Sequence, residues 1–198
     1  MKNWTKTLAG TAAGLLMSLN AASALDLVPA SAAESSAPAV VGQLMQPISP
    51  FVSGQAGSTT SIQQIGSYNS ASSAIEGHSS ASLIDQSGTR NRAVQAIEGH
   101  NSAALLVQGG SNNSVVQASR GDNNFQLVGV SGQNNDIGYI QVGNNLAGVL
   151  DVRDSVNTTV VAVQTPSSSN FMMPSGLRGL NNANVVIVPG RMYVLPKR

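Results

Sequence analysis

Residues 80–115 read SASLIDQSGTRNRAVQAIEGHNSAALLVQGGSNNSV, and this stretch holds one pattern twice. A serine, a glutamine, a glycine and an asparagine at positions 80, 86, 88 and 91 return 22 residues later as Ser102, Gln108, Gly110 and Asn113. A fixed internal period of about 20 to 50 residues indicates a repeat architecture in which neighbouring units bury one another. The repeat therefore indicates a fold built from stacked 22-residue units.

The glycines show that each 22-residue unit consists of two halves of eleven residues. Eight of them follow one another at this spacing without a slip: Gly66, Gly77, Gly88, Gly99, Gly110, Gly121, Gly132 and Gly143. Alternate halves resemble each other more than adjacent ones, because glutamine lies two positions before the first, third and fifth glycine. We expect a tight turn at each of these glycines, since glycine adopts positive φ angles without steric cost.

Eleven residues suit one short strand and one tight turn. Residues 62–65 have strand composition, and residues 66–69 have turn composition. Two strands per 22-residue unit make one coil of a β-solenoid, with successive coils about 4.8 Å apart. We therefore predict an all-β protein with a two-strands-per-coil β-solenoid over 58–165. It ends before Pro166, which cannot donate a ladder hydrogen bond, and a basic tail with short strands follows over 166–198.

Stacking in register brings residues 22 apart into columns that are predicted to face the interior. One column is aliphatic and includes Ile62, Ile84, Leu106 and Val128. Strand side chains alternate between faces, so three glutamines share that interior: Gln64, Gln86 and Gln108. An asparagine column lies beyond the turn: Asn69, Asn91, Asn113 and Asn135. Buried amides need partners, and stacked amides bond to their own copies, so we predict that these columns form a self-assembly ladder.

The repeat weakens after residue 150. Asp154 takes the next glycine position and Asn157 takes the next asparagine position. We therefore expect the glycine and asparagine columns to continue through these two residues.

Composition and charge exclude several classes of protein. Charged residues make up 10% of the 198-residue chain, against about 25% in a typical soluble domain. The formal net charge is +1, which gives little repulsion between copies and no basic excess for nucleic acid. The chain has no cysteine, which excludes disulfides and thiolate metal sites. A secreted or surface protein fits this composition.

The first 57 residues are predicted to comprise a signal peptide followed by a linker or a targeting arm. Lys2 and Lys6 precede an uncharged apolar stretch over 8–19, and Ala-Ser-Ala follows at 22–24. This order is typical of a secretory signal peptide, so we predict that 1–24 is removed, with the cut after Ala24 or Ala32. Segment 25–57 contains four prolines among alanine and serine and is predicted to be a linker or a targeting arm.

The repeat resembles the curlin repeat of curli, the bacterial extracellular functional amyloids. A serine, a glutamine, a glycine, an asparagine and then alanine or valine follow at fixed spacings from Ser58, from Ser80 and from Ser102. The resemblance covers about residues 58–150 of the chain. It implies secretion through an outer-membrane pore as an unfolded chain and templated β-polymerisation outside the cell.

We therefore expect a secreted structural subunit of curli-like amyloid fibres at the bacterial cell surface, serving adhesion and biofilm. Its partners would be further copies of itself and other curlin-type subunits, and it could be a major or a nucleating subunit. The open strand edges at the ends of a solenoid are templates for such stacking. The alternative is a monomeric surface β-solenoid adhesin that binds polysaccharide or a host surface. It would need an aromatic platform, but Tyr68, Phe125 and Tyr139 do not share a column.

Two identical bends carry the histidines. Glu76 and His78 flank one bend glycine, and Glu98 and His100 flank the same bend one coil later. Such a cluster suits a divalent metal or pH-sensitive stacking, but we favour an exposed bend at which Glu and His are simply soluble. We expect no metal site and no cofactor, and we expect no catalysis, because no Ser-His-Asp grouping stands out. Asp151, Arg153 and Asp154 are interpreted as a solvated turn.

Two features lie outside the ladder. An aliphatic column on the outer face, Leu83, Leu105, Leu127 and Val149, marks a contact, either with the C-terminal segment, which we favour, or with a second filament. The tail has four cations and no acid, whereas 25–154 has four cations and nine acids, a charge of −5. The tail cations are predicted to meet an anionic cell surface, or else to fold back on the acidic solenoid: Arg178, Arg191, Lys197 and Arg198.

Overall fold

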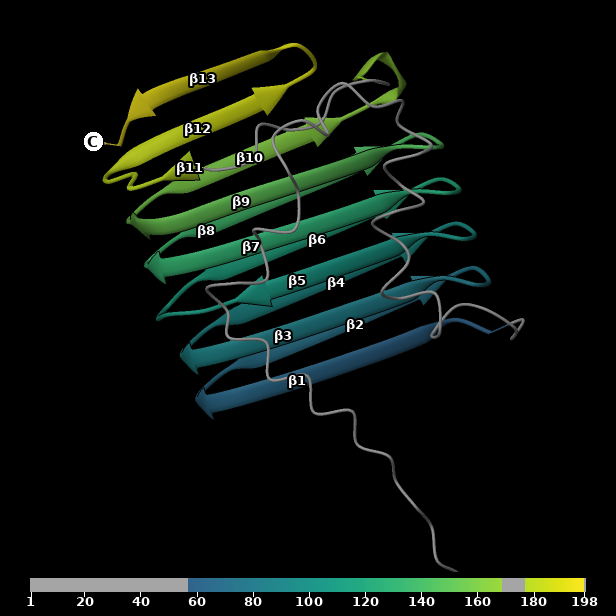
Figure 1. Cartoon of the computed structure of the whole chain (residues 1–198), viewed down its shortest axis with the longest axis horizontal. Coiled ribbons are helices and arrows are strands. Elements are labelled where there is room, and N and C mark those ends of the chain that lie inside the picture. Colours follow the sequence, from purple (N-terminus) through teal and green to yellow (C-terminus); the bar gives the residue numbers. More distant parts are fainter. Residues whose placement is uncertain (1–56, 169–176, 198) are drawn as a thin grey trace, which may run out of the picture.

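The chain forms a stack of strands arranged in two sheets, seen in a computed structural model that describes residues 57–168 and 177–197 (Figure 1). Sheet A contains, in order, β1 (Thr59–Ser67), β3 (Ala81–Thr89), β5 (Ala103–Gln108), β7 (Phe125–Gln133), β9 (Ala147–Val156) and β11 (Leu177–Arg178). Sheet B contains β2 (Ser70–Glu76), β4 (Arg92–Glu98), β6 (Ser114–Arg120), β8 (Asp136–Val142), β10 (Thr159–Gln164), β12 (Ala183–Val188) and β13 (Arg191–Pro196).

The chain alternates between the sheets, so each coil contributes one strand to each of them. Neighbouring strands are parallel and in register at 22 residues, as Ile62 pairs with Ile84 and Ile84 with Leu106. The prediction of a β-solenoid with two strands per 22-residue coil is confirmed.

The hydrophobic core lies between the two sheets. Ile84, Leu106, Val128 and Leu150 point inward from sheet A and are fully buried. Their apolar counterparts in sheet B are Ala93, Val115, Ile137 and Val160, which belong to the same cluster. Parallel strands that hide one face in this way bury apolar side chains at alternate positions, as the repeat predicts.

A β-bulge in β9 changes the register by one residue. Val130 pairs with Val152, but Gly132 pairs with Ser155, so β9 contains one residue more than β7 between these pairs. The prediction that Asp154 and Asn157 continue the glycine and asparagine columns is therefore wrong. Ser155 takes the glycine position, and Thr158 takes the asparagine position, where its N–H donates to Asn135 Oδ1.

Both sheets continue past the expected end at Pro166. β11 pairs with β9 and β12 pairs with β10, each in parallel, and Leu177, Val185 and Ile187 join the core. Pro166 begins a short 3-10 turn, η3 (Pro166–Ser168), and its ring lies against the Gly143 bend. A proline there interrupts the series of bend hydrogen bonds but leaves the strands free to resume. β13 then pairs antiparallel with β12 and ends sheet B.

Other predictions fall on residues that the structure does not describe. The predicted signal peptide, 1–24, lies outside the described residues, and so does nearly all of the predicted arm, 25–57. Within 57–168 and 177–197 there is no helix long and apolar enough to cross a membrane.

Candidate self-assembly site

The glycine bends hold successive coils in close backbone contact. Gly88 has a φ of 119°, and a Cβ built on it would lie 1.9 Å from the carbonyl oxygen of Gly110 in the next coil. A side chain at this position is thus excluded both by backbone conformation and by the neighbouring coil. The other seven repeat glycines also have positive φ angles: Gly66, Gly77, Gly99, Gly110, Gly121, Gly132 and Gly143.

The glutamine column bonds from copy to copy, as the sequence predicts. The side-chain amides of Gln64 and Gln86 are 2.6 Å apart, and those of Gln86 and Gln108 are 2.7 Å apart. Gln86 and Gln108 are fully buried. The column ends there because Val130 follows, and Gln108 Nε2 donates to the Asn113 carbonyl at 2.8 Å.

The asparagine column bonds mainly to the backbone rather than from amide to amide. Asn91 Oδ1 accepts the backbone N–H of Asn113, at 3.1 Å, one coil later. Asn91 Nδ2 donates to the Ser87 carbonyl at 3.2 Å and to the Gly110 carbonyl at 3.0 Å. The neighbouring asparagines repeat this arrangement: Asn69, Asn113 and Asn135. Each asparagine therefore fastens the bend of its own coil to the bend of the next.

Sequence reasoning missed two further polar columns. Gln95 and Gln117, inward-facing in sheet B, bond to each other at 2.6 Å, and both are buried. On the other bend, Ser80 Oγ accepts the N–H of Ser102 at 3.2 Å and donates to the Gly99 carbonyl at 3.1 Å. The 22-residue spacing of these residues was the available signal.

A tyrosine closes the glutamine column of sheet B. Tyr139 pairs in register with Gln117, is fully buried, and donates its hydroxyl to Gln164 Oε1 at 2.7 Å. Gln141 Nε2 donates to the same tyrosine oxygen at 3.0 Å and to Gln164 Oε1 at 2.8 Å. Burial raises the pKa of Tyr139 above its ordinary range, which keeps the hydroxyl protonated as a donor.

The two ends of the described stack differ. In the first coil, Ile62 is 43% exposed and Gln64 is also exposed, although their copies one coil later are buried. Ile65 of the same strand is 58% exposed. At the other end β13 is exposed along its whole length and runs against the direction of the strands below it.

The histidine bends form a column with their own hydrogen bonds. The rings of His78 and His100 stack with centroids 5.4 Å apart, and His100 Nδ1 accepts the N–H of His78 at 3.1 Å. Asp122 Oδ1 accepts the N–H of His100 at 2.8 Å one coil later. Glu98 pairs with Arg120 at 3.1 Å. Among the described residues no three His, Cys, Asp or Glu side chains gather where a metal ion would need them.

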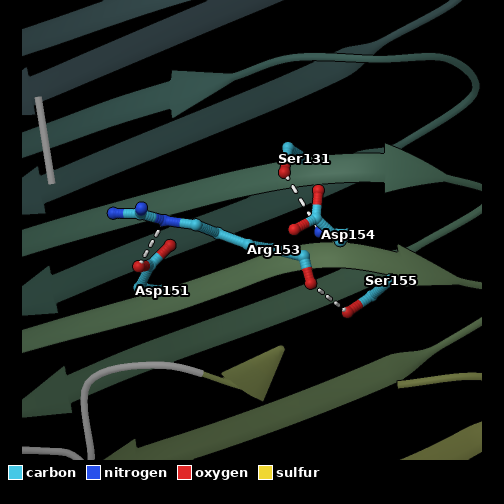
Figure 2. A network of polar contacts seen from close by, with 5 residues as sticks. All are labelled: Ser131, Asp151, Arg153, Asp154 and Ser155. Atoms are coloured by element: carbon cyan, nitrogen blue, oxygen red, sulfur yellow. Dashed lines mark hydrogen bonds and ion pairs between the residues drawn. The ribbon is translucent and has the colours of Figure 1, made fainter. Parts of the chain in front are cut away.

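The bulge carries a largely buried ion pair of Asp151 and Arg153, so the interpretation as a solvated turn is wrong for these two residues, whereas Asp154 is exposed (Figure 2). Asp151 is 6% exposed, and its carboxylate lies 2.7 Å from Arg153 Nε. Burial raises the pKa of Asp151, although the hydrogen bond and charge of Arg153 and the charge of Arg178 oppose the shift. The backbone N–H of Asp154 donates to Ser131 Oγ at 3.2 Å and fixes the extra residue.

The described tail cations lie on or directly after the last strands of the stack. Arg178 is exposed on β11, Arg191 opens β13, and Lys197 Nζ donates to Thr159 Oγ1 at 3.2 Å. Arg198 lies outside the described residues.

Within 57–168 and 177–197, fold and site together define a two-sheet β-solenoid with internal amide columns and an open N-terminal coil. Comparison of the chain with protein-family models, with curated proteins and with solved structures finds no match.

Proposed function

We propose that this protein is a secreted structural subunit that stacks coil on coil into curli-like extracellular amyloid fibres for surface adhesion and biofilm. The observation that carries the proposal is the open first coil. It presents Ile62 and Gln64 in the same register in which Ile84 and Gln86 are buried by their neighbours. A strand edge from another copy would bury the exposed isoleucine and pair with the edge of the first coil, and both steps favour association.

The backbone hydrogen bonds of β1 indicate which of its residues would pair with a second copy. The N–H of Thr59 donates to the Ser80 carbonyl, so this residue faces β3. Alternate residues of a parallel strand bond to opposite neighbours. The backbone groups that point to the free edge of β1 therefore belong to Thr60, Ile62 and Gln64. These residues form the surface on which a second copy would pair.

The opposite end offers β13 to the next subunit. The N–H of Lys197 donates to the Asn182 carbonyl at 2.7 Å, which places Met192 and Val194 with their backbone groups toward the free edge. In a head-to-tail fibre, β2 of one copy then lies along β13 of another. Because β13 is reversed, this junction is antiparallel in sheet B.

The proposal includes the partners that the curlin-like pattern implies. These are further copies of the chain, other curlin-type subunits and an outer-membrane secretion pore, with an anionic cell surface near the tail cations. The monomeric adhesin gains no support from the site, since Phe125 and Tyr139 are buried and provide no aromatic platform on the described repeats.

Fibre formation by the purified chain tests the proposal. The chain from Leu25 onward, incubated at roughly tens of micromolar, should form thioflavin-positive fibres with a meridional reflection at about 4.8 Å. A folded protein that remains monomeric under these conditions would overturn the proposal.

A further inference from the structure

Part of the outer face of sheet A is buried where an exposed surface is expected, while Leu105 and Leu127 on the same face are partly buried. Its apolar residues point away from the core, yet Phe125 is 1% exposed and Val149 is 2% exposed. The corresponding outer face of sheet B leaves Val116 46% exposed and Ile140 40% exposed. The two faces have the same strand geometry, so strand packing alone does not account for the difference.

The C-terminal segment is not the cover in the part of it that the structure describes. Residues 177–197 lengthen the two sheets and do not lie across sheet A. Among the residues that the structure describes, the hydrophobic cluster on this face is formed by six residues of sheet A: Ala81, Ala103, Leu105, Phe125, Leu127 and Ala147. Our expectation that the tail covers this column therefore fails for 177–197.

We propose that residues 25–56 dock along the outer face of sheet A. The segment ends at the base of this face, because Thr59 pairs with Ala81, and Ala103, Phe125 and Ala147 follow above it. Four strand spacings of about 4.8 Å separate Thr59 from Ala147, a distance that roughly six extended residues cover. The segment is long enough to cross the face several times.

The composition of the segment matches this face. Its second half is rich in large apolar residues, including Val41, Leu44 and Ile48. It contains no Lys or Arg, and its two acids, Asp26 and Glu34, lie farthest from Thr59 along the chain. The cations of sheet A, Arg153 and Arg178, lie at the far end of the stack from Thr59. Apolar residues would thus meet the aliphatic column, and the acids would reach the arginines.

Docking also has a consequence for fibre assembly, and this consequence rests on the proposed function. A covered sheet A prevents two solenoids from joining side by side through their apolar faces, while the strand edges at both ends stay open for growth. The 25–56 segment would therefore direct association toward end-to-end stacking.

Cysteine reactivity in the chain from Leu25 onward tests the docking directly, because the natural chain has no cysteine. Val149→Cys probes the outer face of sheet A, and Val116→Cys is the matched control on sheet B. In freshly isolated monomer we expect Val149→Cys to react with a maleimide at least tenfold more slowly than Val116→Cys. Equal rates would overturn the proposal.

A second variant of the same full-length form identifies the cover. Combining Val41→Asp, Leu44→Asp and Ile48→Asp should raise the reactivity of Val149→Cys to that of Val116→Cys and leave the control unchanged. Continued protection of the Val149→Cys thiol in this variant would overturn the proposal. If the Val149→Cys thiol in the chain with the natural 25–56 segment lost its protection on dilution, the proposal would also be overturned, and a second copy would be the cover. Because the measurement uses monomer, it is separate from the success or failure of fibre formation.

Discussion

At the residue scale, the glycine bends carry the strictest steric requirement. Gly88 meets the carbonyl of Gly110 directly, whereas Gly138, in β8, has no atom within 4 Å of a built Cβ. Gly88→Ala forces a strained φ angle and pushes two coils apart, so we expect it to lower the free energy of unfolding by at least about 2 kcal/mol. Gly138→Ala should leave it unchanged or raise it by about 0.5 kcal/mol. Urea unfolding of the monomer measures both, and equal losses would contradict the close contact.

The asparagine column leads to a second residue-scale prediction. Asn113→Ala removes an acceptor from the Asn135 N–H and a donor from the carbonyls of Gly109 and Gly132. Each buried group left unpaired costs roughly 1–3 kcal/mol. We expect Asn113→Ala to slow polymerisation far more than Ser111→Ala on the same bend, as measured by thioflavin kinetics.

The glutamine column should respond in the same way. Gln108→Ala breaks the bond to Gln86 and the bond to the Asn113 carbonyl, so it too should polymerise far more slowly than Ser111→Ala. Identical kinetics for the three variants would refute the ladder.

A partly buried carboxylate predicts an unusual pH dependence. Burial raises the pKa of Asp85 above 3.8, so the folded chain holds this proton to a higher pH than the unfolded chain. Between those two pKa values the unfolding free energy contributed by Asp85 falls as pH rises, and the ionised group destabilises the fold at neutral pH. We expect Asp85→Asn to be more stable than the natural chain at about pH 7, with the gain shrinking toward about pH 4. Urea unfolding would reveal the opposite sign if the carboxylate were stabilising, and the exposed Asp136→Asn is the control.

At the scale of the element, a substitution at the edge of β1 should affect fibre assembly without affecting the folding of the monomer. Thr60 directs its backbone N–H to the free edge of β1, whereas the neighbouring Ser61 faces β3. Proline removes that N–H and is tolerated only at an edge. Thr60→Pro should therefore leave the monomer folded and slow fibre elongation at least tenfold.

Ser61→Pro is the matched control for this edge. It removes a bond inside the ladder, so circular dichroism of the monomer should show a destabilised first coil, by about 1 kcal/mol or more. If Thr60→Pro elongated fibres at the natural rate, β1 would not be a growing edge.

The strands could be predicted from the sequence over the part of the chain in which the 22-residue period holds. Eight glycines at constant spacing fixed the coil length, and alternation fixed which side chains face inward, including Ile84 and Gln86. The bulge escaped prediction for a physical reason. Asp154 and Asn157 both adopt positive φ angles, 52° and 50°, and therefore resemble the turn residues of the repeat although the register has changed.

The polar sites were less predictable than the strands. Gln95 and Gln117 occur in only two coils, between Ser73 and Tyr139, so their column has no long period. The backbone partners of the asparagines depend on how closely two bends approach, which residue spacing alone does not specify. The continuation of both sheets after Pro166 depends on pairing between distant segments, and the repeat carries no signal for it.

At the scale of the whole molecule, the solenoid has unlike ends and unlike faces. The N-terminal coil continues the parallel register, and the edge strand of sheet B at the C-terminal end, β13, is reversed. Positive charge also distinguishes the two ends, because the cations of the last segment lie at the end that carries β13. Removing residues 166–198 is a poor test of their role, since Leu177, Val185 and Ile187 would leave the core.

Replacing charge alone tests whether this end meets an anionic surface. Arg191→Gln, Lys197→Gln and Arg198→Gln together change no core residue and remove three positive charges. Each cation near an anionic membrane contributes about 1 kcal/mol, so the triple variant should bind anionic vesicles roughly a hundredfold more weakly at low salt. Arg90→Gln with Arg92→Gln, on the body of the solenoid, should have a much smaller effect. If the triple variant bound as tightly as the natural chain, the tail cations would instead serve the acidic solenoid itself, and the anchoring role would be lost.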